Sequence, residues 1–222
     1  MTTVAGLFDN WRDVQTLLAA LEQEGIERSR IDLIANLAAY GDIIGDSAYG
    51  RLLLLGIPGI GPVLATEAIA DEVDGKGLDI TGGGFVRFLT SREILRETAE
   101  LYAEGIRRGG TLVTVSVPPA KMDAVRSAMA HHQAMDLEAL SRHYNRSGFA
   151  GFDQNAFALS PEEITYERHT RHRDTAKAYR PAAHGATPLT QDQLDALDND
   201  DDSVLSDSDA EKRAGTGTRL SV

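Results

Sequence analysis

The hydrophobic pattern of the first forty residues predicts a strand, an amphipathic helix and a second strand. Thr2–Phe8 is typical of a strand, and so is Ile31–Ala35. The segment between them has one apolar face at helical spacing, formed by Val14, Leu17, Leu18 and Leu21. Asp9 and Asn10 are both candidates to cap this helix, and Gly25 is placed to end it. These elements form a compact β-α-β unit.

A second group of elements begins at residue 85. Phe85–Leu89 predicts a strand, and Thr90 with Glu93 has the spacing of a capping box at the start of a helix. The pair Gly109–Gly110 is expected to end that helix. Thr111–Val117, which is β-branched at most positions, predicts the clearest strand in the chain.

The remaining pattern predicts a helix, a strand and a last helix. Pro118 begins a segment typical of a helix start, and Ala134–Leu140 predicts a last strand. Ser160, followed by Pro and two Glu, predicts a capped helix that runs to about Tyr179. From Pro181 onward, sparse apolar content and many Asp and Ser residues predict disorder.

With the central insert and its helix left out, the order is β-α-β followed by β-α-β, which predicts an α+β fold of the ferredoxin-like type. One face of its antiparallel sheet carries two helices, and the other is expected to be bare until the insert or a second subunit covers it. We expect a domain at 1–142 with an insert at about 41–84. A Gly/Phe-rich linker and helix at 143–180 and a disordered acidic tail at 181–222 would follow.

The strongest single feature is the apolar segment Arg51–Ala70, which is interrupted by Gly and Pro. Each large apolar side chain in it would gain roughly 1.5–3 kcal/mol on full burial. Leu52–Thr66 contains fifteen uncharged residues, whereas a membrane-spanning helix needs about 20. We therefore expect burial against protein, and a self-association surface formed by Leu52, Leu53, Leu54, Leu55, Ile57, Pro58, Ile60, Pro62, Val63 and Leu64.

Charge is unevenly distributed along the 222 residues, whose net charge is −12. This sign argues against binding to nucleic-acid phosphates. Residues 186–222 contain nine acidic and three basic residues, whereas Tyr166–Arg180 contains five basic and two acidic ones. Both stretches are typical of solvated surface. The alternative is that the C-terminal segment meets a charged partner, either another protein or, for its basic part, the chain's own tail.

Motifs for catalysis and for metal binding are weak in this sequence. It contains no G-x-S-x-G element, and Gly75-Lys76-Gly77 lacks the spacing of a phosphate-binding loop. His169 and His172 can share a helix face, but a structural metal site normally has four ligands. We therefore expect no enzyme, no metal and no cofactor. The absence of Cys and of a signal peptide leads us to expect a cytoplasmic location.

Three segments in order resemble a known family: VAGLFDNWRDVQTLLAALEQEGIERSRIDLIA, GIPGIGPVLA and AELYAEGIRRGGTLVTVSV. Together, over Thr3–Leu140, they are similar to the bacterial general stress protein family, also called the heat-induced stress protein YflT domain, with low-temperature-induced proteins as related members. The resemblance implies a link to stress responses and no established activity. Many members carry a longer Gly/Ala-rich insert, sometimes labelled membrane-associated. The insert here is shorter and holds Arg51 and Glu67.

We therefore expect a non-enzymatic, stress-associated interaction or structural protein that forms a homo-oligomer through the apolar insert and the sheet face. One alternative is a module that senses a small molecule with the Gly-rich loop Gly75–Gly84. The other is a peripheral membrane protein that inserts Leu52–Leu64 at the lipid interface.

Overall fold

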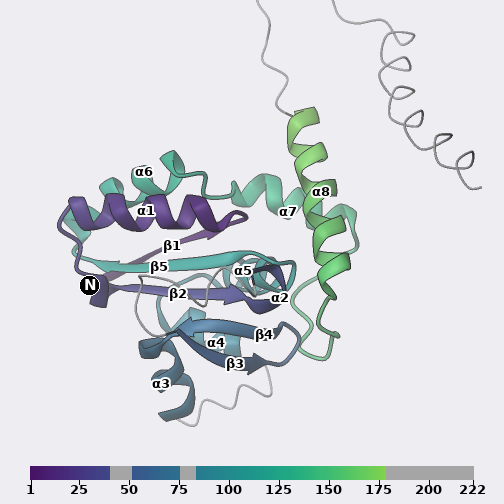
Figure 1. Ribbon diagram of the computed structural model, residues 1–222, viewed down its shortest axis with the longest axis horizontal. Helices are drawn as coiled ribbons and strands as arrows, with labels where there is room; N and C mark the ends of the chain where they lie inside the picture. The colour runs from purple at the N-terminus through teal and green to yellow at the C-terminus, as the bar shows by residue number, and fades with distance from the viewer. Residues whose placement is uncertain (41–51, 76–83, 179–222) are drawn as a thin grey trace, which may run out of the picture. The chain divides into compact units, whose positions relative to one another are not determined.

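Five antiparallel strands form the sheet at the centre of the fold (Figure 1). The computed structural model describes residues 1–40, 52–75 and 84–178. The strand order is β1 (Thr2–Phe8), β5 (Thr111–Val117), β2 (Ile31–Asn36), β4 (Gly61–Thr66) and β3 (Leu52–Ile57). Because β1 and β2 each pair antiparallel with β5, they run parallel to each other. The segment β1-α1-β2 is therefore a split β-α-β unit.

The helices of the described residues connect these strands and extend the chain beyond them. They are α1 (Trp11–Gln23), α2 (Leu37–Tyr40), α3 (Glu67–Gly75), α4 (Gly84–Ser91), α5 (Arg96–Arg107), α6 (Met122–His131), α7 (Leu137–Arg146) and α8 (Pro161–Ala178), with short 3-10 turns at Arg28–Arg30 and Pro119–Lys121. Residues 1–179 form one compact unit.

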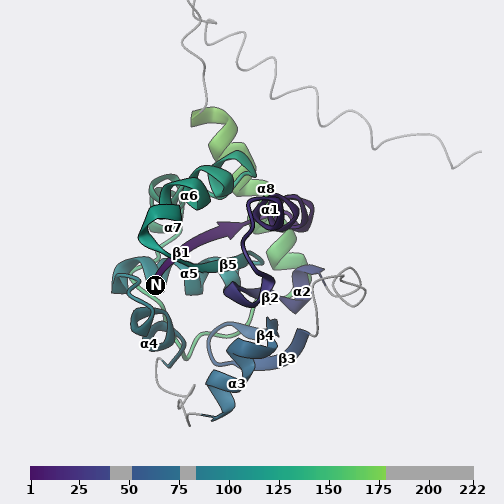
Figure 2. The ribbon, with the colours of Figure 1, turned by 90° about the vertical axis from the view of Figure 1, so that its left-hand side faces the viewer.

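Helices cover both faces of the sheet (Figure 2). On one face, α1 and α6 pack their apolar stripes on β1, β5 and β2, with Leu17 and Met129 among the buried side chains. On the other face, α4, α5 and α7 form a second core that contains Phe88, Ile106 and Tyr144. The prediction of a bare face was therefore wrong, because the chain covers that face with its own helices.

The predicted strand Phe85–Leu89 is also wrong, since these residues lie in helix α4. A short apolar run fits a strand and a buried helix equally well, and here the helix buries Phe85, Val86, Phe88 and Leu89 together. The capping box at Thr90 is absent as well: its hydroxyl donates to Arg87 O inside α4. Glu93 instead adopts a left-handed backbone, φ 66°, in the turn before α5.

Most of the predicted strand Ala134–Leu140 is helix α7. Asp136 caps this helix, because its Oδ1 accepts hydrogen bonds from the backbone of Glu138 and Ala139 at 2.8 and 3.2 Å. One strand-like contact with β1 is present, where Met135 N–H donates to Leu7 O at 2.8 Å. The extended segment therefore makes one hydrogen bond to β1 before Asp136 caps α7 and the helix begins.

The other local predictions for the described residues are confirmed. Of the two cap candidates, Asn10 caps α1, whereas Asp9 pairs with arginines of α8. The strands β1, β2 and β5 form as expected. Ser160 and Glu163 make the reciprocal bonds of a capping box at α8. The mixed α+β class is confirmed too. Residues 41–51 of the expected insert, most of the Gly-rich loop at 76–83 and the acidic tail predicted at 181–222 lie outside the described residues.

The apolar segment forms the β3–β4 hairpin and widens the sheet. At its turn, Gly59 has φ +77°, and a Cβ there would lie 2.6 Å from Asp153 O and 2.7 Å from Gln154 Cα. The segment that leads into α8 therefore packs directly on the hairpin turn, and only glycine allows this approach.

Replacing Gly59 with Ala is expected to destabilise the fold through both backbone strain and this contact. The left-handed conformation alone costs about 1–2 kcal/mol for an L-residue. The clash with the backbone of residues 153 and 154 adds about 1–3 kcal/mol. Urea denaturation measures the combined loss in the free energy of unfolding. Gly25→Ala is the matched control, because Gly25 has φ +71° and nothing within 4 Å of its Cβ position. Equal losses in the two variants would contradict the proposed contact.

Candidate functional site

The structure gathers the predicted self-association residues in one hairpin and divides them between its two faces. Ile57, Ile60 and Val63 are at most 3% exposed and belong to the protein's own core. Leu53 and Leu55 are partly buried on the same face, as is Pro58 at the turn. These side chains therefore pack largely within their own chain.

The opposite face of the hairpin is more open. Leu54 pairs across the strands with Leu64, and its side chain is 62% exposed. Leu52 and Leu64 are only partly buried, against the core beneath α1, and Pro62 is exposed. We call Leu52, Leu54, Pro62 and Leu64 the hairpin patch. These are the predicted residues on the hairpin face opposite Ile57 and Val63.

β3 is also the edge of the sheet, since it pairs only with β4 among the described strands. Its six residues, LLLLGI, contain no charged side chain and no proline. Natural edge strands usually carry charged side chains or proline, which hinder pairing with another strand through the exposed row of backbone N–H and C=O groups. This edge therefore lacks a common protection against such pairing.

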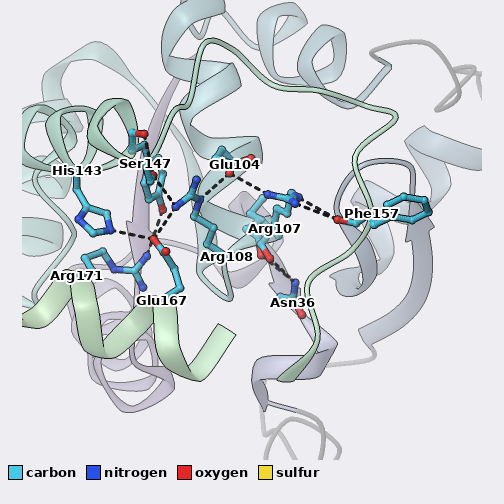
Figure 3. A network of polar contacts seen from close by, with 11 residues as sticks. Asn36, Glu104, Arg107, Arg108, His143, Ser147, Phe157, Glu167 and Arg171 are labelled. Atoms are coloured by element: carbon cyan, nitrogen blue, oxygen red, sulfur yellow. Dashed lines mark hydrogen bonds and ion pairs between the residues drawn. The ribbon is translucent and has the colours of Figure 1, made fainter. Parts of the chain in front are cut away.

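A second site lies around α8, which charged contacts attach to the rest of the unit. Figure 3 shows Glu167 between Arg108 and His143: its Oε1 lies 2.8 Å from Arg108 Nη1 and 3.0 Å from His143 Nε2. Arg108 also donates from Nε to Glu104 Oε1 at 2.6 Å, and its guanidinium stacks 4.3 Å over the Tyr144 ring. Glu167 thus links α8 to α5 and α7.

Asp9, at the end of β1, is the second carboxylate that holds α8. Its Oδ1 lies 3.1 Å from Arg168 Nε and 2.5 Å from Arg171 Nη2, and its Oδ2 lies 3.1 Å from His172 Nε2. Arg171 is 5% exposed and also donates to Tyr144 Oη at 3.3 Å. One carboxylate therefore faces two guanidinium groups and an imidazole.

These contacts shift the pKa values of the buried groups. Burial by itself would raise the pKa of Glu167, but the hydrogen bond and charge of Arg108, followed by those of His143, hold it below its ordinary value of 4.5. Burial by itself would lower the pKa of Arg108, but the hydrogen bonds and charges of Glu167 and Glu104 outweigh it. The pKa of Arg108 therefore lies above its usual value. Both partners are therefore ionised at neutral pH.

A cavity of about 690 Å³ lies between α7 and α8, beside Asp9 and the start of α1. Its lining contains four arginines and three histidines against three aspartates. Arg142 and Arg146 come from α7, one turn apart, and Arg168 and His169 come from α8. We call this cavity the basic groove. Its lining has an excess of basic groups although the whole chain is acidic.

Sequence reasoning did not identify this site. The sequence places His169 and His172 on one helix face, and the structure pairs His172 with Asp9. Within the described residues, no group of three or more His, Cys, Asp or Glu side chains is placed to hold a metal ion. The only signal in the sequence was the excess of basic residues in Tyr166–Arg180.

Comparisons with known proteins do not add a function. No family model matches the chain, and neither curated proteins nor solved structures yield a match. In the part of the chain that the structure describes, no helix has both the length and the apolar character needed to cross a membrane.

Glu167→Gln is expected to lower stability at neutral pH by about 1–3 kcal/mol, because charge-assisted hydrogen bonds to Arg108 and His143 are lost. The folded pKa of Glu167 lies below its unfolded value, so the wild-type contribution is present above about pH 4.5 and is lost as the pH falls through the folded pKa. The variant should therefore lose less stability than the wild type between neutral and acid pH. Denaturant titrations at several pH values measure this difference.

Glu162→Gln is the matched control, since Glu162 is an exposed residue in the first turn of the same helix. Its effect on the free energy of unfolding should stay within about 0.5 kcal/mol. Parallel pH profiles for Glu167→Gln and the wild type would show that the ion-pair network does not control the acid sensitivity.

Proposed function

We propose that this protein is a non-enzymatic, stress-associated interaction protein of the cytoplasm, and that two copies associate through β3 and the hairpin patch. The observation that carries the proposal is an apolar edge strand without charge or proline, whose central Leu54 is 62% exposed. Large exposed apolar side chains on a sheet edge favour a protein partner over water. The link to stress rests on the family resemblance in the sequence.

The backbone of β3 supports a second copy as the partner. Two identical edge strands satisfy each other when they pair antiparallel about a two-fold axis, since each presents the same pattern of donors and acceptors. Leu54 lies near the middle of Leu52–Ile57. The two Leu54 side chains would therefore meet near the axis and extend the sheet across both copies.

We also propose that the core has the ferredoxin-like order expected from the sequence. The split unit β1-α1-β2 around β5, followed by α6 and the bond from Met135 N–H to Leu7 O, supports this assignment. The insert expected at about 41–84 would then contain the β3–β4 hairpin and α3, and α4 and α5 would be further elements between the two halves. Its partly exposed hairpin would be the part that serves association.

Leu54→Asp is expected to convert the assembly to monomers, because it places a charge at the centre of the apolar edge. The loss should be at least about 2 kcal/mol per buried Leu, or more than tenfold in the dissociation constant. Light scattering after size exclusion and native mass spectrometry of the full chain measure the mass directly.

Leu95→Asp is the matched control, since Leu95 is another exposed leucine, 77% accessible, just before α5 and outside the hairpin patch. This variant should keep the wild-type mass. A wild-type protein that is monomeric at high micromolar concentration would overturn the proposal, as would an unchanged mass in Leu54→Asp.

A further inference from the structure

The basic groove has the size of a small-molecule site. It measures about 690 Å³, within the range of roughly 300–1,000 Å³ that such sites occupy. Residues of α7 and α8 line it, together with Asp9, the start of α1 and the residues before α7. This groove lies away from β3 and the hairpin patch, so its role is independent of the proposed association.

The walls combine apolar and cationic groups. Met135, Ala139 and Leu140 line the groove beside the arginines of α7 and α8. Leu140 is 3% exposed and belongs to the core, so this wall is backed by packed side chains. Such a surface suits a ligand that carries an apolar body next to its charged group.

The charges around the groove favour an anion. Four arginines line it against three aspartates. Two of these aspartates already bind protein donors, because Asp9 pairs with Arg168 and Arg171 and Asp136 caps α7. The lining therefore offers more cationic than anionic groups to a ligand.

The two arginines of α7 are suited to contact such a ligand. Arg142 lies 2.5 Å from Glu138, but both side chains are more than half exposed, at 57% and 83%. Exposed ion pairs of this kind contribute little, so Arg142 can exchange Glu138 for a ligand at low cost. Guanidinium groups bind carboxylates and phosphates through paired hydrogen bonds.

We propose that the basic groove binds a small organic anion. A carboxylate or phosphate group would contact Arg142, Arg146 and Arg168, and an apolar body would pack on Met135, Ala139 and Leu140. Binding would couple α7 to α8, because the ligand touches both helices. The protein would thereby act as a binding module for such anions in addition to associating with its own copies.

Phenyl phosphate, benzoate, inorganic phosphate and benzyl alcohol test this proposal with the full-length protein. Ligands that bind the folded state raise the melting temperature in proportion to the logarithm of their concentration. We expect phenyl phosphate or benzoate, or both, to raise it at millimolar concentration, and the comparison of the two distinguishes phosphate from carboxylate. Inorganic phosphate should act more weakly and the uncharged benzyl alcohol not at all.

Arg142→Gln/Arg146→Gln should weaken binding of the better ligand at least about tenfold, which corresponds to one lost charge-assisted hydrogen bond. Isothermal titration calorimetry measures the dissociation constant. Arg28→Gln/Arg126→Gln is the matched control, since both arginines form ion pairs with acidic neighbours and lie outside the groove. This control should bind like the wild type.

Ala139→Phe supplies a second variant that leaves every charge in place and fills the apolar part of the groove. It should abolish the temperature shift while the circular dichroism spectrum stays that of the wild type. The proposal is overturned if neither organic anion binds the wild type. It is also overturned if the double arginine variant binds as tightly as its control, or if benzyl alcohol stabilises as much as phenyl phosphate does.

Discussion

The central constraint on this fold is that β5 must be shielded from water on both of its faces. Six of its seven residues are buried. Val113, Val115 and Val117 face the core beneath α1 and α6, whereas Leu112 faces the core beneath α4 and α5. A strand that buries side chains on both faces needs helices on each side. The covering of the sheet therefore follows from the apolar character of one strand.

Charge, more than apolar packing, positions α8 on this framework. Ile164 is its one fully buried apolar side chain among the described residues, at 1% exposure, while Glu167, Arg168 and Arg171 make ion pairs to other elements. Partly buried ion pairs define a position well, although desolvation cancels much of their attraction. The wall of the basic groove is therefore more sensitive to pH and salt than the sheet is.

The hairpin patch and the basic groove belong to opposite edges of the sheet. β3 is one edge strand and β1 is the other, and Asp9 follows directly after β1. A partner strand on β3 would therefore extend the sheet away from the groove. The proposed self-association and the proposed anion site can thus be occupied at the same time.

Local sequence determined β1, β2 and β5 by their apolar and β-branched runs, α1 by its apolar spacing and cap, and the start of α8 by its capping box. It did not determine Phe85–Leu89 or Ala134–Leu140, because short apolar runs fit both the strand and the helix period. Tertiary packing decided them, by burying α4 on the sheet and letting Asp136 cap α7. It also decided the charged site, because the Asp9–Arg171 pair joins residues 162 positions apart, and no local pattern encodes a contact between segments so distant in the chain.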